Sequence, residues 1–174
     1  MSVGTLQPPA ALYREDQTFG WWVYAIMLAV TALNVPWLAA EPVQGQDWSD
    51  VGQIATFALK SLLLVGPVFF VIGLGRLTTV VTPAQVRVWF GLIPTYRRFL
   101  PVGSISAVEV VEYQPIRHCG GWGIRRGRGG ELVLNARGSH GVRLHLVDGS
   151  RILIGSQRPE ELAAVIRGAI SPLG

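Results

Sequence analysis

Two long apolar stretches dominate the first half of the chain. No charged residue occurs in 17–40, and the stretch 51–75 contains only one, Lys60. An apolar run of about 20 residues is long enough to cross the hydrocarbon core of a bilayer as a helix. Lys60 lies near the start of its stretch, where a lysine stem can reach toward the interface. The pattern therefore predicts a transmembrane helical hairpin over 19–76, with spans at about 19–40 and 52–75 and a loop at 41–50.

Beyond residue 76 the apolar positions alternate instead. Val86, Val88 and Phe90 alternate with Arg87 and Trp89, as in a half-buried strand. The turn pair Asp148-Gly149 between two alternating runs is a strong hairpin signal. We expect about seven antiparallel strands, at 79–82, 86–90, 96–100, 105–113, 131–135, 142–147 and 151–154.

A helix is expected to close the chain. Pro159 suits the first helical position, and Glu160 and Glu161 suit the positive end of the helix dipole. An apolar stripe follows, formed by Leu162, Ile166, Ala169 and Ile170. The expected fold class is α+β: a transmembrane hairpin, then a pleckstrin-homology-like (PH-like) antiparallel β-barrel capped by a C-terminal α-helix. The strand pattern also allows other small barrels.

Composition and charge add an orientation. Hydrophobic residues make up 49% of the chain and charged residues 15%, against roughly 25% charged residues in typical globular proteins. Residues 1–75 hold two basic and five acidic side chains (net −3), whereas residues 76–174 hold thirteen and six (net +7). The loop 41–50 has no Lys or Arg, whereas Arg14 precedes the first predicted span and four arginines in 76–98 follow the second. By the positive-inside rule, this distribution predicts a multi-pass protein of the inner (plasma) membrane with both termini inside. Both 1–18, a short N-terminal segment, and 77–174, the PH-like domain, are expected in the cytoplasm, with the acidic loop 41–50 outside. A cleavable signal peptide ending near Ala40 is the alternative, and it leaves the C-terminal half cytoplasmic.

The run 113–130 is the main candidate for binding, because it is rich in glycine and arginine and has no acidic residue. Backbone N–H groups of a glycine-rich turn can form an anion-binding concavity, and arginines can contact phosphate through two N–H groups. The alternative is that the glycines only permit a tight turn, with Trp122 packed over the barrel. Candidate ligand- or partner-binding residues here are Arg117, Gly120, Gly121, Trp122, Gly123, Arg125, Arg126 and Arg128.

Arg158 is a further binding candidate. It precedes the last helix, where an anion or ordinary capping is expected. Enzyme chemistry has little support elsewhere. His118, Cys119, His140 and His145 are spaced poorly for one metal ion, and no nucleophile elbow or carboxylate pair occurs. The arginines also lack the aromatic interleaving of a nucleic-acid platform. We therefore expect no catalytic residue, metal, cofactor or nucleic acid.

Four motifs carry a family resemblance: Tyr113-x-Pro115, Gly120-Gly-Trp-Gly-Ile-Arg125, Gly141-Val142 and Gly155-Ser-Gln-Arg-Pro-Glu-Glu-Leu162. Together they resemble a family of small bacterial and archaeal membrane proteins with a two-helix hairpin and a cytoplasmic bacterial PH-like domain. The resemblance covers most of 76–170, and this chain has Ser139-His140 where Asn-Arg is expected. It implies the fold, but no activity.

The expected function is that of a non-enzymatic, membrane-anchored interaction module. Its Gly/Arg loop would face a protein partner or anionic lipid headgroups. The alternative is a small-ligand sensor or an accessory subunit of a larger membrane enzyme or transporter, contacted through Asn34 and Lys60, which are polar residues inside the predicted spans.

Overall fold

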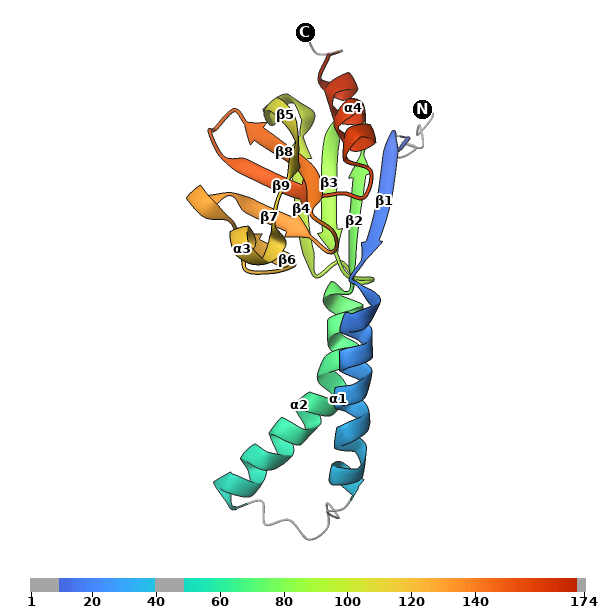
Figure 1. The fold of residues 1–174 in the computed structure, drawn as a ribbon, viewed down its shortest axis with the longest axis vertical. Coiled ribbons are helices and arrows are strands. Elements are labelled where there is room, and N and C mark those ends of the chain that lie inside the picture. The colour runs from blue at the N-terminus through green and yellow to red at the C-terminus, as the bar shows by residue number, and fades with distance from the viewer. Residues whose placement is uncertain (1–9, 40–48, 172–174) are drawn as a thin grey trace, which may run out of the picture.

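The computed structural model describes residues 10–39 and 49–171, without the side chains of Cys119 and Arg128 or those of residues 37–39. The described chain is an α+β protein in which two long helices project from a domain of strands (Figure 1). The four described helices are α1 (Trp21–Ala39), α2 (Val51–Leu74), α3 (Pro115–Cys119) and α4 (Pro159–Ile170).

The strands of the domain form two sheets. The first is antiparallel and has the order β1-β2-β3-β4, from β1 (Tyr13–Thr18), β2 (Arg76–Val81), β3 (Gln85–Phe90) and β4 (Tyr96–Pro101). The second has the order β5-β8-β9-β7-β6, from β5 (Ile105–Glu112), β6 (Gly123–Arg126), β7 (Leu132–Asn135), β8 (His140–Leu146) and β9 (Arg151–Gly155). The short 3₁₀ turn η2 (Val102–Ser104) joins the sheets, and η3 (Arg128–Gly130) precedes β7.

The expected α+β class is confirmed, but the expected antiparallel barrel of about seven strands is wrong. The described residues form nine strands in two sheets, and β4 and β5 follow one another without pairing. Because β8 already lies between β5 and β9, β7 pairs with the other edge of β9, and that pair is parallel. All seven expected strands occur, as β2, β3, β4, β5, β7, β8 and β9. The strands β1 and β6 were not predicted.

The core lies between the sheets and beneath α4. Leu162 and Ile166 of α4 are fully buried, and the helix packs on β5, β8 and η2. The predicted apolar stripe and the C-terminal helix are thus confirmed. Burying a leucine or isoleucine side chain stabilises a fold by about 1.5–3 kcal/mol, so α4 contributes directly to the stability of this core. Other core side chains with no exposed surface include Leu77, Val86, Phe90, Leu134, Leu144 and Ile154.

The two long helices enter the domain almost without linkers. Only Phe19 and Gly20 separate β1 from α1, and only Gly75 separates α2 from β2. Thr18 and Arg76 are partners in the β1–β2 register, so the paired strands continue the paired helices. The Tyr24 hydroxyl donates a hydrogen bond to the Gly75 carbonyl at 2.8 Å. The domain is therefore held in a fixed position on the helices.

The strand β1 lies in the segment 1–18, which the sequence pattern set apart from the domain. It covers the free edge of β2, with its side chains alternately buried and exposed. Two of its inward residues, Glu15 and Gln17, are polar but only 6% and 4% exposed. A strand with polar residues on its inner face lacks the apolar alternation by which strands are recognised.

The long helices differ in how well each fits a membrane span. Among the described helices, α2 has the length and composition of a span: 24 residues with a mean hydropathy of 2.2 in its most apolar part, of which 6% is buried. The described apolar part of α1, Trp21–Pro36, is shorter. The two-span hairpin therefore stays a prediction.

Candidate functional site

The Gly/Arg run folds into α3, a glycine turn and β6. Gly120 ends α3 with φ +72°, and Gly121 and Gly123 also have positive φ, at +120° and +105°. The N–H groups of these three glycines all donate internally: Gly120 to Ile116 O (3.1 Å), Gly121 to Pro115 O (2.9 Å) and Gly123 to Asn135 Oδ1 (3.0 Å). They are therefore not free to form the backbone anion site considered above. The glycines serve the turn, because L side chains rarely adopt these φ values.

Trp122 stands at the tip of this turn and joins the domain to the helices. Its ring meets the ring of Trp22, in the first turn of α1, edge-on with centroids 5.7 Å apart. It also packs, partly buried, against the main core of the domain. An edge-to-face aromatic pair adds about 0.5–1.5 kcal/mol beyond the burial itself. Trp122 thus packs against a long helix as well as the sheets.

Two clefts flank the Trp22–Trp122 contact. The larger has a volume of about 530 Å³ and lies between the helices and the turn, with Val23, Met27 and Phe70 on one wall and Arg125 on the other. The smaller, about 240 Å³, is lined by Trp21, Trp22 and Arg137 among others. Each cleft therefore combines aromatic or aliphatic surface with one arginine. We call the two clefts together the junction site. It comprises Trp22, Trp122, Arg125, Arg137 and the apolar wall formed by Val23, Met27 and Phe70.

The predicted arginines of the run are only partly brought together. Arg125 lines the larger cleft and donates from Nε to the Trp122 carbonyl at 3.2 Å. Arg117 on α3 and Arg126 on β6 are exposed. Arg117, Arg125 and Arg126 have no carboxylate partner within the described part of the chain. The side chain of Arg128 lies outside the described residues. The run therefore carries uncompensated positive charge.

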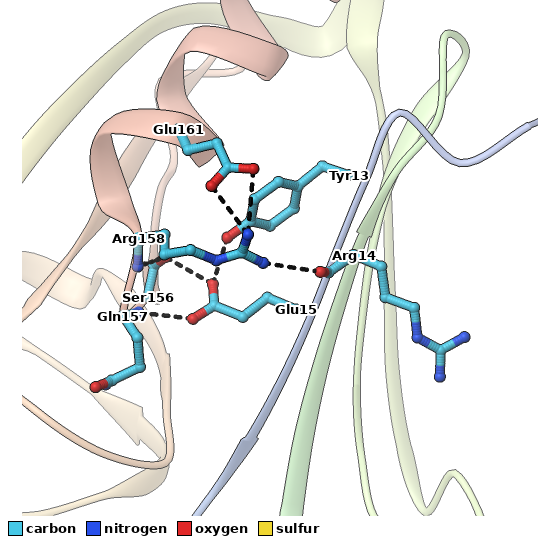
Figure 2. Close-up of polar contacts among 7 residues, drawn as sticks. All are labelled: Tyr13, Arg14, Glu15, Ser156, Gln157, Arg158 and Glu161. Carbon is cyan, nitrogen blue, oxygen red and sulfur yellow. Dashed lines mark hydrogen bonds and ion pairs between the residues drawn. The ribbon is translucent and has the colours of Figure 1, made fainter.

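Arg158 lies away from this site, at the start of α4. Figure 2 shows its guanidinium between β1 and the helix: it pairs with Glu161 at 3.0 Å, donates to the Arg14 carbonyl at 3.1 Å and stacks 5.0 Å from the centroid of the Tyr13 ring. These contacts use much of the hydrogen-bonding capacity of the guanidinium. They favour a structural role for Arg158 over anion binding.

The carboxyl group of Glu15 holds β1 to the same loop. It accepts hydrogen bonds from the Tyr13 hydroxyl (2.6 Å), the Ser156 hydroxyl (2.7 Å) and the Gln157 backbone N–H (2.7 Å), as Figure 2 shows. Burial raises the pKa of the Tyr13 hydroxyl above its ordinary value, and the bond to Glu15 adds to the rise. The motif Gly155-Ser-Gln-Arg158 therefore serves as the attachment point of β1.

A third cleft is more polar. It has a volume of about 460 Å³ and lies over the outer face of the five-stranded sheet, with His118, Glu131, Arg143 and Arg151 in its lining. Arg143 is already paired with Glu131 at 2.6 Å and with Glu109 at 3.2 Å. The charge of Arg143 is therefore balanced, which leaves Arg151 as the arginine of this cleft without a carboxylate partner among the described residues. Within the described residues, no three His, Cys, Asp or Glu side chains are grouped to hold a metal ion.

Sequence reasoning missed the apolar wall of the junction site and, among its aromatic and basic residues, Trp22 and Arg137. Trp22 was interpretable only as an interfacial residue of the first span, and Arg137 sits in the turn between β7 and β8. Both meet Trp122 only through tertiary packing. A tryptophan at the start of an apolar run was the one available signal.

No protein-family model matches the chain, and a search of curated proteins found no match. The resemblance to two-helix membrane proteins with a bacterial PH-like domain rests on the four motifs alone.

Proposed function

We propose that this protein is a non-enzymatic, membrane-anchored PH-like interaction module that meets anionic lipid at the inner leaflet. The membrane anchoring rests on one observation, the exposed apolar surface of the two projecting helices. Leu28, Leu33 and Phe69 are 70–77% exposed, and the most apolar part of α2 is 6% buried. Monomeric soluble proteins rarely expose contiguous apolar patches larger than a few hundred Å². A bilayer removes this surface from water, and helices satisfy their own backbone groups there.

Charge supports the cytoplasmic side for the domain. Residues 76–174, which contain nearly all of the domain, carry a net charge of +7, against −3 for residues 1–75. The inner leaflet carries anionic lipids, and each basic residue near that surface contributes about 1 kcal/mol of attraction. The junction site lies where the helices enter the domain, so its arginines would lie near the headgroups. This placement favours lipid over a soluble protein partner.

The accessory-subunit alternative gains no support from the two polar residues that suggested it. Lys60 is 2% exposed, so its side chain is covered and does not point outward from the helix. The Asn34 side chain donates to the Val30 carbonyl of its own helix at 2.7 Å. Neither residue is presented as an unsatisfied contact for a second membrane protein.

Two measurements test the anchoring. Alkaline carbonate should leave the full chain in the membrane fraction, and detergent should release it. Single cysteines at Ser49 and at Ser104, in a Cys119→Ser background, should differ toward an impermeant maleimide: S49C should react in spheroplasts and S104C only after lysis. Release by carbonate, or labelling of S104C in spheroplasts, would contradict the proposal.

A further inference from the structure

The larger cleft of the junction site has two chemically different walls. Val23, Met27 and Phe70 from the helical pair form an apolar wall, and the turn opposite contributes Trp122 and Arg125. Its volume of about 530 Å³ falls in the range of small-ligand sites, about 300–1,000 Å³. An amphipathic ligand, with a charged group beside the turn and a hydrocarbon part beside the helices, matches this division.

Arg125 supplies the charge. Its Nε donates to the Trp122 carbonyl at 3.2 Å, which leaves the N–H groups of both Nη atoms for a ligand. A Cβ built on Gly121 would lie 3.9 Å from Nη2, so the guanidinium is folded over the turn. No carboxylate pairs with it among the residues that the structure describes. A planar, unpaired guanidinium is well suited to bind a phosphate through two hydrogen bonds.

We infer that this cleft binds one anionic phospholipid of the surrounding leaflet. Arg125 pairs with the headgroup phosphate, and an acyl chain lies along Val23, Met27 and Phe70. Arg137, in the smaller cleft beyond the Trp22–Trp122 contact, adds positive charge on the other side. The inference rests on the proposed membrane anchoring, because lipid reaches the cleft only if the helices lie in a bilayer.

The apolar wall decides between lipid and a free anion. It is continuous with α1 and α2, which carry the exposed apolar surface assigned to the bilayer. A bilayer lipid next to these helices can enter the cleft without leaving the leaflet. A soluble phosphate compound would leave the apolar wall in contact with water.

Native mass spectrometry of the full chain in detergent micelles tests this inference. Phosphatidylglycerol and phosphatidylcholine are added separately at equal concentration. We expect at least a five-fold preference for the anionic lipid at one bound copy, lost in Arg125→Ala and in Arg125→Gln. The glutamine variant retains a donor for the Trp122 carbonyl, so its loss cannot be attributed to that hydrogen bond alone. Near-ultraviolet circular dichroism should show that both variants remain folded.

Arg167→Ala is the matched control. Arg167 is also exposed and donates to one backbone carbonyl, that of Val108 at 3.0 Å, but it lies on α4, away from the helical pair (Figure 1). It should leave the lipid preference unchanged. Equal binding of the two lipids, equal loss in Arg167→Ala, or binding of free glycerol phosphate as strong as that of the lipid would overturn the inference. Carbonate extraction of each variant shows separately whether anchoring itself has failed.

Discussion

Three hydrogen bonds converge on the carboxyl group of Glu15, which is 6% exposed. A buried polar group is costly unless it is satisfied, and leaving one unpaired costs about 1–3 kcal/mol. Glu15 is satisfied only when β1 lies against the Ser156–Gln157 backbone, so it fixes this one position of the strand. An apolar residue here would bury equally well but would not specify the partner loop.

Tyr13→Phe tests this arrangement. Loss of the hydrogen bond to Glu15 should lower the free energy of unfolding at pH 7 by about 1–3 kcal/mol. Because burial raises the pKa of Tyr13 in the folded state, its contribution is complete below the unfolded pKa of about 10 and is lost as pH rises above it. Denaturant unfolding in micelles at pH 7 and pH 11 should therefore show a smaller loss of unfolding free energy at alkaline pH in the variant.

The control is Tyr96→Phe. Tyr96 is half-buried, and its hydroxyl has no hydrogen-bond partner among the described residues. Equal effects of the two substitutions would contradict the assignment.

Glycines at two positions should respond to alanine in opposite directions. Gly91 has φ +95°, and a Cβ there would collide with the carbonyl oxygens of Gly73 and Ile93. Gly91→Ala should cost at least about 2 kcal/mol, combining backbone strain with displacement of the turn from α2. Gly168 is exposed within α4, and among the described residues no group outside the neighbouring helix backbone lies within 4 Å of the position that an alanine Cβ would take there. Gly168→Ala should stabilise by about 0.5–1 kcal/mol. Thermal unfolding of both variants measures the difference, and a loss of stability in Gly168→Ala would contradict it.

At the level of elements, the sequence pattern located every strand whose inner face is apolar. The strand β3 is typical, with Val86, Val88 and Phe90 buried as expected. The strand β1 was not predicted, because the polar residues Glu15 and Gln17 point inward and their hydrogen-bond partners lie about 140 residues away in the chain. The strand β6 is four residues long and contains two arginines. The parallel pairing of β7 with β9 depends on which sheet edge is free, which no local pattern records.

The candidate site, like the strands, was predictable from the sequence only where a local pattern records it. The turn at Gly120, Gly121 and Gly123 was recognisable from glycine alone, because positive φ is a local requirement. The junction site was not, since Trp22 and Trp122 are 100 positions apart and meet only after β1 and β2 pair. Arg158 illustrates the converse: a basic residue before a helix allowed two functions, and only its contacts with Glu161 and Tyr13 favour one.

Replacing the long helices by a turn should yield a soluble domain. Thr18 and Arg76 are register partners on adjacent antiparallel strands, so Asn-Gly inserted between them would form a two-residue hairpin loop. We expect this shortened chain to be monomeric on size exclusion and to unfold cooperatively. A fragment of residues 77–174 lacks β1, exposes the edge of β2 and should aggregate or unfold. If the fragment were as stable as the shortened chain, β1 would be dispensable to the fold.

For the molecule as a whole, the short junctions between helices and strands fix how the domain sits on α1 and α2, and so how it would face the proposed membrane. The β1–β2 ribbon continues α1 and α2, and the Trp22–Trp122 contact braces one side. On another side the turn between β3 and β4 is bonded to the last turn of α2: Leu92 N–H donates to the Ile72 carbonyl at 2.8 Å, and the Thr95 hydroxyl to the Gly73 carbonyl at 2.5 Å. A domain held at several points has little freedom to tilt relative to the two helices.

In the proposed membrane arrangement, this geometry would place the tip of the β3–β4 turn in the interface of the bilayer. Leu92 and Ile93 are 60% and 68% exposed. Leu92 is bonded to Ile72, which lies within the final turn of α2 and thus about 3–5 Å inside the end of the predicted span. A fluorophore on Ile93→Cys, in a Cys119→Ser background, should therefore be quenched by spin-labelled lipid in reconstituted vesicles.

The control is Val147→Cys. Val147 is 72% exposed, but its N–H donates to the carbonyl of Ser104, which lies beyond the opposite end of β4. Since β4 spans six residues, roughly 20 Å of strand, a probe at position 147 should escape quenching if the domain stands as the junctions require. Equal quenching at both positions would mean that the domain lies on its side, and the fixed orientation on which the junction site depends would then be wrong.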